Sequence, residues 1–168
     1  MMDTQIQIGL ANRQEAVHIA EISRLYVEEG LGWSWRPQRI RDAMKNPDTA
    51  VVKASVDAMF AGFAVMRFGS QEAHLDLIAV KPRFRRNGVG TALLGWLEES
   101  VNTAGISIVR LELREKNKNA FAFYEKRGYK KVRRIEGYYS GIENGVELAR
   151  DCCVSPVMDE IIRNTIDR

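Results

Sequence analysis

Cysteine and histidine are scarce in this sequence, and their scarcity excludes several kinds of site. The 168 residues include two cysteines, Cys152 and Cys153, and two histidines, His18 and His74. Adjacent residues of a strand-like run point to opposite faces and cannot easily form a bridge, so we expect reduced thiols that pack. Two sequential thiols and two scattered histidines do not match the ligand spacing of a metal site. The sequence therefore predicts neither a disulfide nor a bound metal.

Long apolar runs and a strong charge of one sign are also missing. No apolar stretch approaches the roughly 20 residues of a membrane span, and the N-terminus lacks a basic region followed by an apolar core. The net charge of +3 would favour an anionic ligand but falls short of a nucleic-acid-binding surface. The basic pairs at 130–131 and 133–134 are expected at a solvated strand edge. We therefore expect a cytoplasmic protein that binds neither membranes nor nucleic acid.

The length and composition fit one domain over residues 1–168. Hydrophobic periodicity and turn signals predict seven strands, near 6–8, 49–55, 59–68, 74–80, 108–113, 129–135 and 146–154. Helices are expected at 13–29, near 37–44, from Val89 to Gly105, at 117–127 and in a short tail over 156–168. Hairpins mixed with two strand-helix-strand crossovers indicate an α/β (α+β) fold, with one mixed sheet flanked by helices.

Two short segments are predicted to be turns. Residues 56–58 are few enough for a hairpin connection, and Asn144-Gly145 is a strong turn dipeptide. The tail over 156–168 could cap the domain or join the interface of a homodimer, and the sequence does not choose between them.

A glycine turn, Arg85-Arg86-Asn87-Gly88-Val89-Gly90, lies between an apolar strand and an amphipathic helix. A turn that leads into a helix offers free backbone N–H groups and the positive end of the helix dipole, which suit a pyrophosphate bound without metal. Gly88 and Gly90 allow close approach and positive φ, while Arg85 and Arg86 add charge. The spacing matches neither a Rossmann fingerprint nor a P-loop. The alternative is a glycine turn with solvated arginines.

The strand end at 77–80 and this glycine turn together resemble motif A of the GCN5-related N-acetyltransferase (GNAT) superfamily. The resemblance implies acetyl-CoA as co-substrate and a mostly antiparallel sheet. It also implies that the strand end pairs with the pantetheine arm and that the turn binds the pyrophosphate. The cofactor-binding residues implied in this way are Ile78, Ala79, Val80, Arg85, Arg86, Asn87, Gly88, Val89, Gly90 and Thr91.

A second motif follows, with Leu-Glu-Leu-Arg at 111–114, then Asn117, Tyr124 and Gly128. It resembles the branch that acetylates protein N-termini, especially the ribosomal-protein alanine N-acetyltransferases, although Tyr129 stands where that branch has Phe. The resemblance extends from about residue 72 to 139. It implies direct acetyl transfer from acetyl-CoA to a primary amine in a ternary complex, with a protein N-terminal α-amine as the favoured acceptor. A small-molecule amine or a lysine side chain is the alternative acceptor, and a non-catalytic acyl-CoA-binding module is the alternative of another class.

Acetyl transfer to an amine needs a base for the ammonium proton and an acid for the leaving thiolate. Tyr124, which the resemblance places against the sulfur, is the candidate acid because a phenol with a pKa of about 10 stays protonated at neutral pH. Asn117 is expected to bind the pantetheine arm, or only to cap its helix.

Two residues compete for the role of base. Glu112 matches the glutamate of the N-terminal branch, and His74 has a side chain whose unperturbed pKa of about 6.5 suits proton acceptance. Each could instead be an ordinary strand residue, and Asp76 could orient His74 or attract a cationic substrate. Four aromatic residues, Trp33, Trp35, Tyr138 and Tyr139, are expected in loops that could flank the acceptor channel, and for the tryptophans packing over the core is favoured.

Overall fold

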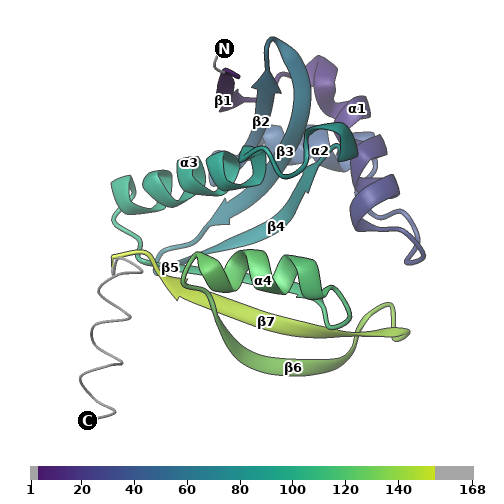
Figure 1. Ribbon diagram of the computed structural model, residues 1–168, viewed down its shortest axis with the longest axis vertical. Helices are drawn as coiled ribbons and strands as arrows, with labels where there is room; N and C mark the ends of the chain where they lie inside the picture. Colours follow the sequence, from purple (N-terminus) through teal and green to yellow (C-terminus); the bar gives the residue numbers. More distant parts are fainter. Residues whose placement is uncertain (1–3, 154–168) are drawn as a thin grey trace.

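The computed structural model describes residues 4–153, in which seven strands form a single sheet (Figure 1). Strand order is β1-β2-β3-β4-β5-β7-β6, and every neighbouring pair is antiparallel except β4 and β5, which are parallel. The strands are β1 (Ile6–Leu10), β2 (Thr49–Val56), β3 (Met59–Phe68), β4 (Glu72–Val80), β5 (Ile108–Arg114), β6 (Lys130–Tyr139) and β7 (Glu143–Asp151). The predicted mixed, mostly antiparallel, seven-stranded sheet is confirmed.

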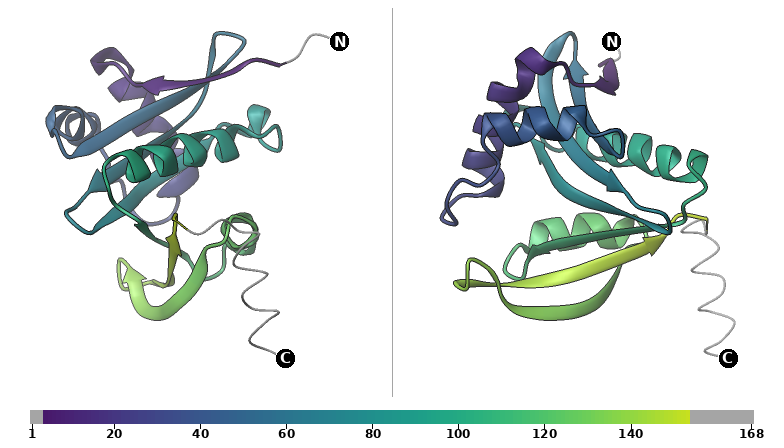
Figure 2. Two further views of the ribbon diagram at one scale, coloured as in Figure 1. Left: turned by 90° about the vertical axis from the view of Figure 1, so that its left-hand side faces the viewer. Right: turned by 180° about the vertical axis from the view of Figure 1, so that it is seen from behind.

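Helices cover both faces of the sheet (Figure 2). The helices α3 (Val89–Thr103) and α4 (Lys118–Lys126) lie on one face, and α1 (Ala16–Ile22) and α2 (Pro37–Lys45) lie on the other. Apolar side chains form one core beneath α3 and a second beneath α1 and α2. Short helical turns η1 (Arg13–Glu15), η2 (Ser23–Val27) and η3 (Pro82–Phe84) connect these elements. Within residues 4–153, no helix has the length and apolar character needed to cross a membrane.

The single helix expected over 13–29 is divided into η1, α1 and the π-helical turn η2. The buried carboxylate of Glu28 ends η2, because it accepts hydrogen bonds from Ser23 Oγ at 3.0 Å and from the Ser34 N–H at 2.7 Å. Gly30 and Gly32 then turn the chain with positive φ. The hydrogen-bonded carboxylate of Glu28 therefore fixes the segment after η2. The apolar periodicity of the sequence does not reveal these hydrogen bonds, so the predicted helix extends too far.

One predicted turn is confirmed and the other is wrong. Asp57 and Ala58 connect β2 to β3 with positive φ, as expected for residues 56–58. Asn144 and Gly145, by contrast, lie inside β7, and the chain turns at residues 140–142. The Asn144 side chain accepts from the Gly137 N–H at 3.0 Å, and a Cβ on Gly145 would lie 3.0 Å from Cβ of Tyr138. These residues serve cross-strand contacts that the dipeptide pattern does not reveal.

A bulge at Asp76 reverses the alternation of side chains between the two faces of β4. Val65 of β3 pairs with Leu77 and the next residue, Met66, pairs with Leu75, so Asp76 is left without a partner in β3. Before the bulge, Leu75 packs into the core beneath α3, whereas Leu77 packs into the core beneath α1 and α2. One strand at the centre of the sheet therefore supplies both cores.

The end of the described chain differs from expectation in one respect. β7 ends at Asp151, and the free cysteines Cys152 and Cys153 follow it outside the strand. The helix expected over 156–168 lies outside the described residues.

Candidate active site

A cleft opens where the parallel strands β4 and β5 separate. They pair only over Glu72–Leu75 and Ile108–Leu111, and they diverge beyond that point (Figure 1). The cleft has a volume of about 460 Å³, and Leu75, Ile78 and Leu111 belong to its walls. Within residues 4–153, β4 beyond Leu75 pairs with β3 alone. The backbone groups on its other edge therefore face the cleft and are available to an extended ligand.

The sequence-predicted strand end occupies this edge. Ile78 lines the cleft, whereas the side chain of Ala79 faces the core beneath α1 and α2. Val80 reaches the glycine turn, since its carbonyl oxygen accepts from Nε of Arg85 at 2.9 Å. Arg85 thus bends back along the strand end while its side chain stays exposed.

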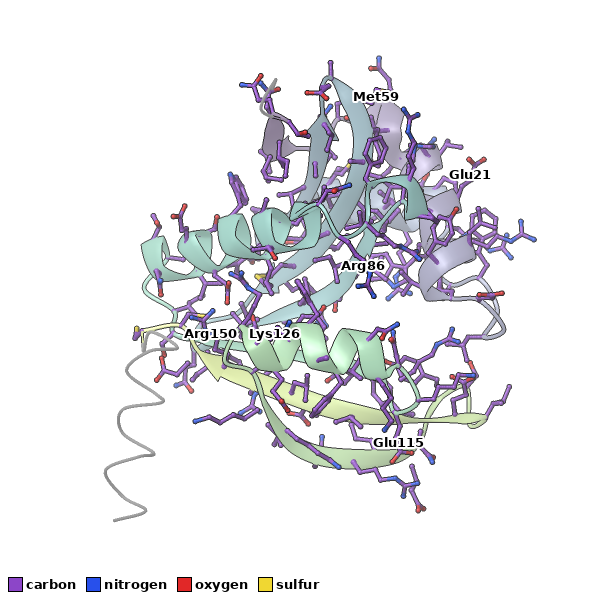
Figure 3. All side chains as sticks on the ribbon, in the orientation of Figure 1. Glu21, Met59, Arg86, Glu115, Lys126 and Arg150 are labelled. Carbon is purple, nitrogen blue, oxygen red and sulfur yellow. The ribbon has the colours of Figure 1, made fainter. Side chains whose placement is uncertain are left out.

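The glycine turn lies at the beginning of α3, with Gly88 as its N-cap in the left-handed conformation, φ 81°. Ala92 donates to the carbonyl of Gly88 at 2.9 Å, and the N–H groups of Asn87 to Thr91 precede this bond. Arg86 also has positive φ, 62°, and its side chain lies between the start of α3 and α4 in Figure 3. The turn therefore offers unpaired helix-terminal donors and an adjacent cation, as anion binding requires.

Helix α4 brings two further sequence-predicted residues to the cleft. Tyr124 is 5% exposed and lines the cleft, and burial, followed by the charge of nearby Tyr139, raises its pKa well above the usual value. Asn117 also lines the cleft, but its Oδ1 caps α4 by accepting from the Ala120 N–H at 3.1 Å. The cap uses the side-chain oxygen of Asn117 and leaves its amide hydrogens. Asn117 can therefore cap α4 and bond to a pantetheine arm at the same time.

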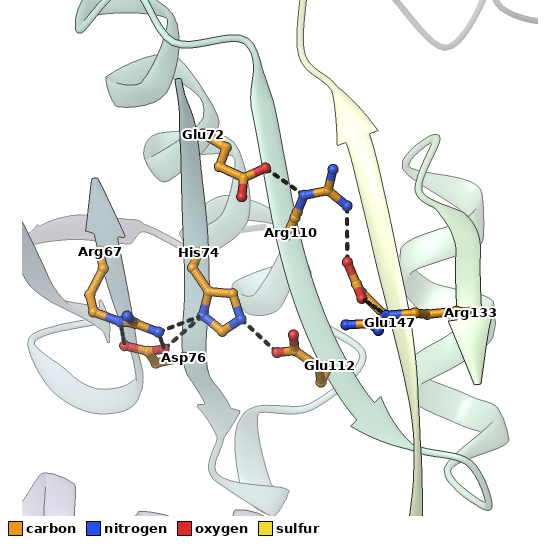
Figure 4. Close-up of polar contacts among 8 residues, drawn as sticks. All are labelled: Arg67, Glu72, His74, Asp76, Arg110, Glu112, Arg133 and Glu147. Atoms are coloured by element: carbon orange, nitrogen blue, oxygen red, sulfur yellow. Dashed lines mark hydrogen bonds and ion pairs between the residues drawn. The ribbon is translucent and has the colours of Figure 1, made fainter. Parts of the chain in front are cut away.

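The two rival bases contact one another (Figure 4). His74 Nε2 lies 2.6 Å from Oε2 of Glu112, and His74 Nδ1 lies 2.7 Å from Oδ1 of Asp76. Glu112 and Asp76 line the cleft. Leu111 and Leu113 point into the core beneath α3, so strand alternation directs Glu112 to the opposite face from α4. Tyr124 and Glu112 thus reach one cleft from opposite faces of the sheet.

The carboxylates strongly perturb His74. Hydrogen bonds to Asp76 and then to Glu112 raise the pKa of His74 to about 9, against the smaller opposing effect of burial. Burial of Asp76 favours its neutral form, but hydrogen bonds from His74 and Arg67, together with their charges, lower its pKa below the usual value. A pKa of about 9 favours the protonated form of His74 at neutral pH, which argues against an imidazole poised to accept a proton.

Two arginines near the cleft make contacts that the spacing of residues in the sequence does not predict. Arg114 Nη2 donates to the carbonyls of Val27 and Glu29 at 2.8 and 2.7 Å, and so ties the segment after η2 to the end of β5. Arg67 bonds to both oxygens of Asp76. Both contacts join segments whose proximity depends on the strand order.

The aromatic residues expected in loops divide into two groups. Trp33 and Trp35 pack against the core beneath α1 and α2, and Trp33 Nε1 donates to the Ala20 carbonyl at 3.1 Å. Tyr138 and Tyr139 lie in β6 and not in a loop, which corrects the prediction, and Tyr139 lines the cleft. Within residues 4–153, no three His, Cys, Asp or Glu side chains are grouped so that they could hold a metal ion.

Comparison with known proteins identifies the family of this chain. The family model described as an acetyltransferase (GNAT) domain matches residues 9–144. The chain belongs to the GNAT acetyltransferase family. The matched region includes the whole cleft described above, so this GNAT domain carries its candidate active site within the part that defines the family.

The relatives of this GNAT chain include N-terminal acetyltransferases. It is 35% identical over 101 residues to the ribosomal protein bS18-alanine N-acetyltransferase of Salmonella typhimurium, a match that covers 58% of this chain and 68% of that enzyme. The match to the Escherichia coli enzyme of that name covers 62% of it. Over 81 residues the chain is 37% identical to an N-alpha-acetyltransferase of Saccharolobus solfataricus, covering 48% of each chain.

Solved structures agree with the sequence comparison. The crystal structure of Ard1 from Thermoplasma volcanium superposes with a TM-score of 0.79 at 26% identity, covering 87% of this chain and 97% of that one. The ribosomal-protein-S18-alanine N-acetyltransferase from Escherichia coli gives a TM-score of 0.74 at 25% identity, with 88% and 94% covered. An aminoglycoside 6'-N-acetyltransferase solved with coenzyme A shares the fold at 21% identity and a TM-score of 0.72.

Proposed function

We propose that this GNAT enzyme transfers the acetyl group of acetyl-CoA to the N-terminal α-amine of a protein. The observation that carries the proposal is the meeting of Tyr124 and Glu112 at one cleft, each from its own face of the sheet. The names of the relatives with 35% and 37% identity support this acceptor, since both denote enzymes that acetylate protein N-termini.

The donor fits the cleft by the chemistry of its walls. The unpaired edge of β4 at 76–80 can exchange hydrogen bonds with the amides of a pantetheine arm, and the amide hydrogens of Asn117 can bond the same arm. The N–H groups at the start of α3 and the Arg86 guanidinium suit the pyrophosphate. A Cβ on Gly90 would lie 3.5 Å from Cζ of Phe123, so any larger side chain there would fill the space between α3 and α4.

The chemistry requires three proton transfers besides the acyl transfer. The acceptor ammonium first loses one proton, which Glu112 takes directly or through water, and the neutral nitrogen then attacks the thioester carbonyl. The C–N bond forms, the C–S bond breaks, and a water molecule takes the second proton of the nitrogen. Tyr124 donates its hydroxyl proton to the departing thiolate and recovers a proton from solvent. No acetyl-enzyme is formed, because the amine attacks directly.

The acceptor is proposed to enter from the Glu112 face. There the segment after η2 meets the turn between β6 and β7, where Ser140 Oγ donates to the Leu31 carbonyl at 3.2 Å. Glu29 also lines the cleft, and its carboxylate would attract an α-ammonium group.

Acetylation of a peptide panel tests the proposal. Peptides with different N-terminal residues would be compared with the same peptides blocked at the α-amine but carrying a free lysine, and with polyamines and free amino acids. We expect turnover of acetyl-CoA with free N-termini and none with the blocked peptides. Transfer only to lysine or to small amines would replace the proposed acceptor. Tight acetyl-CoA binding without turnover on any amine would identify a non-catalytic acyl-CoA-binding module.

A further inference from the structure

His74 is held by carboxylates on both sides of its ring (Figure 4). Its Nδ1 lies 2.7 Å from Asp76 Oδ1, and its Nε2 lies 2.6 Å from Glu112 Oε2. An ionised carboxylate can only accept hydrogen bonds, so both ring nitrogens must carry a hydrogen to make these two contacts. An imidazole with two N–H groups is the imidazolium cation, and it has no lone pair with which to accept a proton.

Arg67 completes the cluster on the side away from Glu112. Its Nε donates to Asp76 Oδ2 at 2.6 Å and its Nη2 donates to Asp76 Oδ1 at 2.7 Å, so the guanidinium binds both oxygens of the carboxylate. The Asp76 and Glu112 side chains are only 10% and 16% exposed. Two cations and two anions therefore alternate across β3, β4 and β5 and balance each other.

One competing arrangement exists, because Arg67 Nη2 also lies 3.1 Å from His74 Nδ1. If Nδ1 were unprotonated, it could accept from Arg67. Its lone pair would then face the Asp76 oxygen at 2.7 Å, and that oxygen already accepts from the same Arg67 nitrogen. Two acceptors at this distance repel each other, which favours the doubly protonated ring.

We propose that His74 is a positioning residue, a fixed imidazolium that Asp76 and Arg67 hold in place and that orients the Glu112 carboxylate toward the acceptor amine. This inference rests on the proposed function, in which Glu112 accepts the amine proton. His74 binds Oε2 of Glu112. Each carboxylate oxygen can accept more than one hydrogen bond, so Glu112 can still bond to the amine or to a water molecule. Tyr138 of β6 also bonds to this carboxylate, and Tyr139 is a further titratable group near it.

The location of the contact explains why a cation is useful there. Backbone pairing between β4 and β5 ends at Leu75 and Leu111, and Glu112 is the first residue of β5 beyond the last pair. At this point the backbone no longer fixes the spacing of the two strands. The bond from His74 to Glu112 supplies a side-chain link across the opening, so the carboxylate is held at the apex of the cleft.

Nitrogen-15 NMR of the imidazole rings tests the charge state without any assay of activity. The chain has two histidines, and the His18→Gln variant assigns their signals. Burial, followed by the charge of Lys81, lowers the pKa of His18 below its usual value, so the two titrations are separated. We expect both nitrogens of His74 to be protonated at pH 7.5, with titration near pH 9. A neutral tautomer at pH 7.5 would overturn the proposal, whatever the acceptor proves to be.

Kinetics of His74→Gln test the positioning role. The variant keeps a side-chain N–H that can reach Glu112 but removes the charge. Loss of a general base lowers kcat about 100-fold, and we expect a smaller loss of kcat in this variant. The acidic limb of the pH profile should move to higher pH, and KM for acetyl-CoA should stay unchanged. A limb near pH 6.5 in the wild type that disappears in the variant, with a larger loss of kcat, would make His74 the base. An unchanged kcat and pH profile would also overturn the proposal. If the variant does not fold, the NMR experiment on the wild type still decides.

Discussion

Asn117 Oδ1 accepts a hydrogen bond from the Ala120 N–H at 3.1 Å, so the residue expected to bind the pantetheine arm is also the cap of α4. Asn117→Asp keeps the capping oxygen but removes the amide hydrogens, whereas Asn117→Ala removes both. We expect both variants to raise KM for acetyl-CoA, and only the alanine variant to lose about 1 kcal/mol of unfolding free energy. Steady-state kinetics and thermal unfolding measure the two effects. An aspartate variant with the wild-type KM would leave Asn117 as a cap alone.

Gly88 provides a test of the glycine turn. Its φ of 81° is unfavourable for residues with a Cβ, so Gly88→Ala should cost about 1 kcal/mol of stability and weaken acetyl-CoA binding, while Gly88→Asn should be better tolerated. Gly95, in the interior of α3, is the matched control. A Cβ there would lie an ordinary 3.7 Å from Nη2 of Arg127, and Gly95→Ala should raise stability by about 0.5 to 1 kcal/mol. Calorimetric titration with acetyl-CoA would contradict the proposed role if Gly88→Ala bound as tightly as Gly95→Ala.

Tyr124 and Tyr129 form a matched pair of buried phenols whose ring centroids are 5.4 Å apart. Tyr124→Phe should lower kcat about 100-fold or more, because it removes the proposed acid. Tyr129 directs its hydroxyl to Oε2 of Glu98 at 3.3 Å, so Tyr129→Phe should reduce stability by about 1 kcal/mol and leave kcat close to wild type. Pre-steady-state turnover with one peptide acceptor separates the two. A wild-type kcat for Tyr124→Phe would move the acid role to another group.

The stability of the protein should depend on pH through His74. Its folded-state pKa of about 9 lies above the unfolded value of about 6.5, so protonation stabilises the fold fully below pH 6.5. The contribution is lost as pH rises through 9, and a shift of this size corresponds to about 3 kcal/mol at most. Denaturant unfolding between pH 6 and 10 should therefore show a decline that His74→Gln removes. Equal declines in both proteins would assign the effect to other groups.

The sequence was informative wherever a contact is local in the chain. The strand, glycine turn and helix over 72–103 follow from periodicity and from residues that are neighbours in sequence, and the structure has them in this order. Asn117 and Tyr124, which the resemblance to the family placed at the cofactor site, also lie at the cleft. Local turn chemistry was less reliable at Asn144, whose side chain bonds to Gly137 across the hairpin.

The relation between His74 and Glu112 could not be predicted, because 38 residues separate them. Their contact depends on the parallel register of β4 and β5, which no local pattern specifies. The bulge at Asp76 was equally hidden, since the strand reads as a regular alternation through that residue. For this reason the sequence presents His74 and Glu112 as alternative bases, whereas in the structure their side chains contact each other.

The unpaired residue at Asp76 is an insertion in an otherwise regular strand. Leu75 and Leu77 pair with the adjacent residues Met66 and Val65, so removing Asp76 would leave Leu75 facing the core beneath α3 and Leu77 facing the core beneath α1 and α2. A regular strand that kept Asp76 would instead place Leu75 and Leu77 on the same face. The bulge therefore adds one carboxylate to the cleft without disturbing the packing of either core.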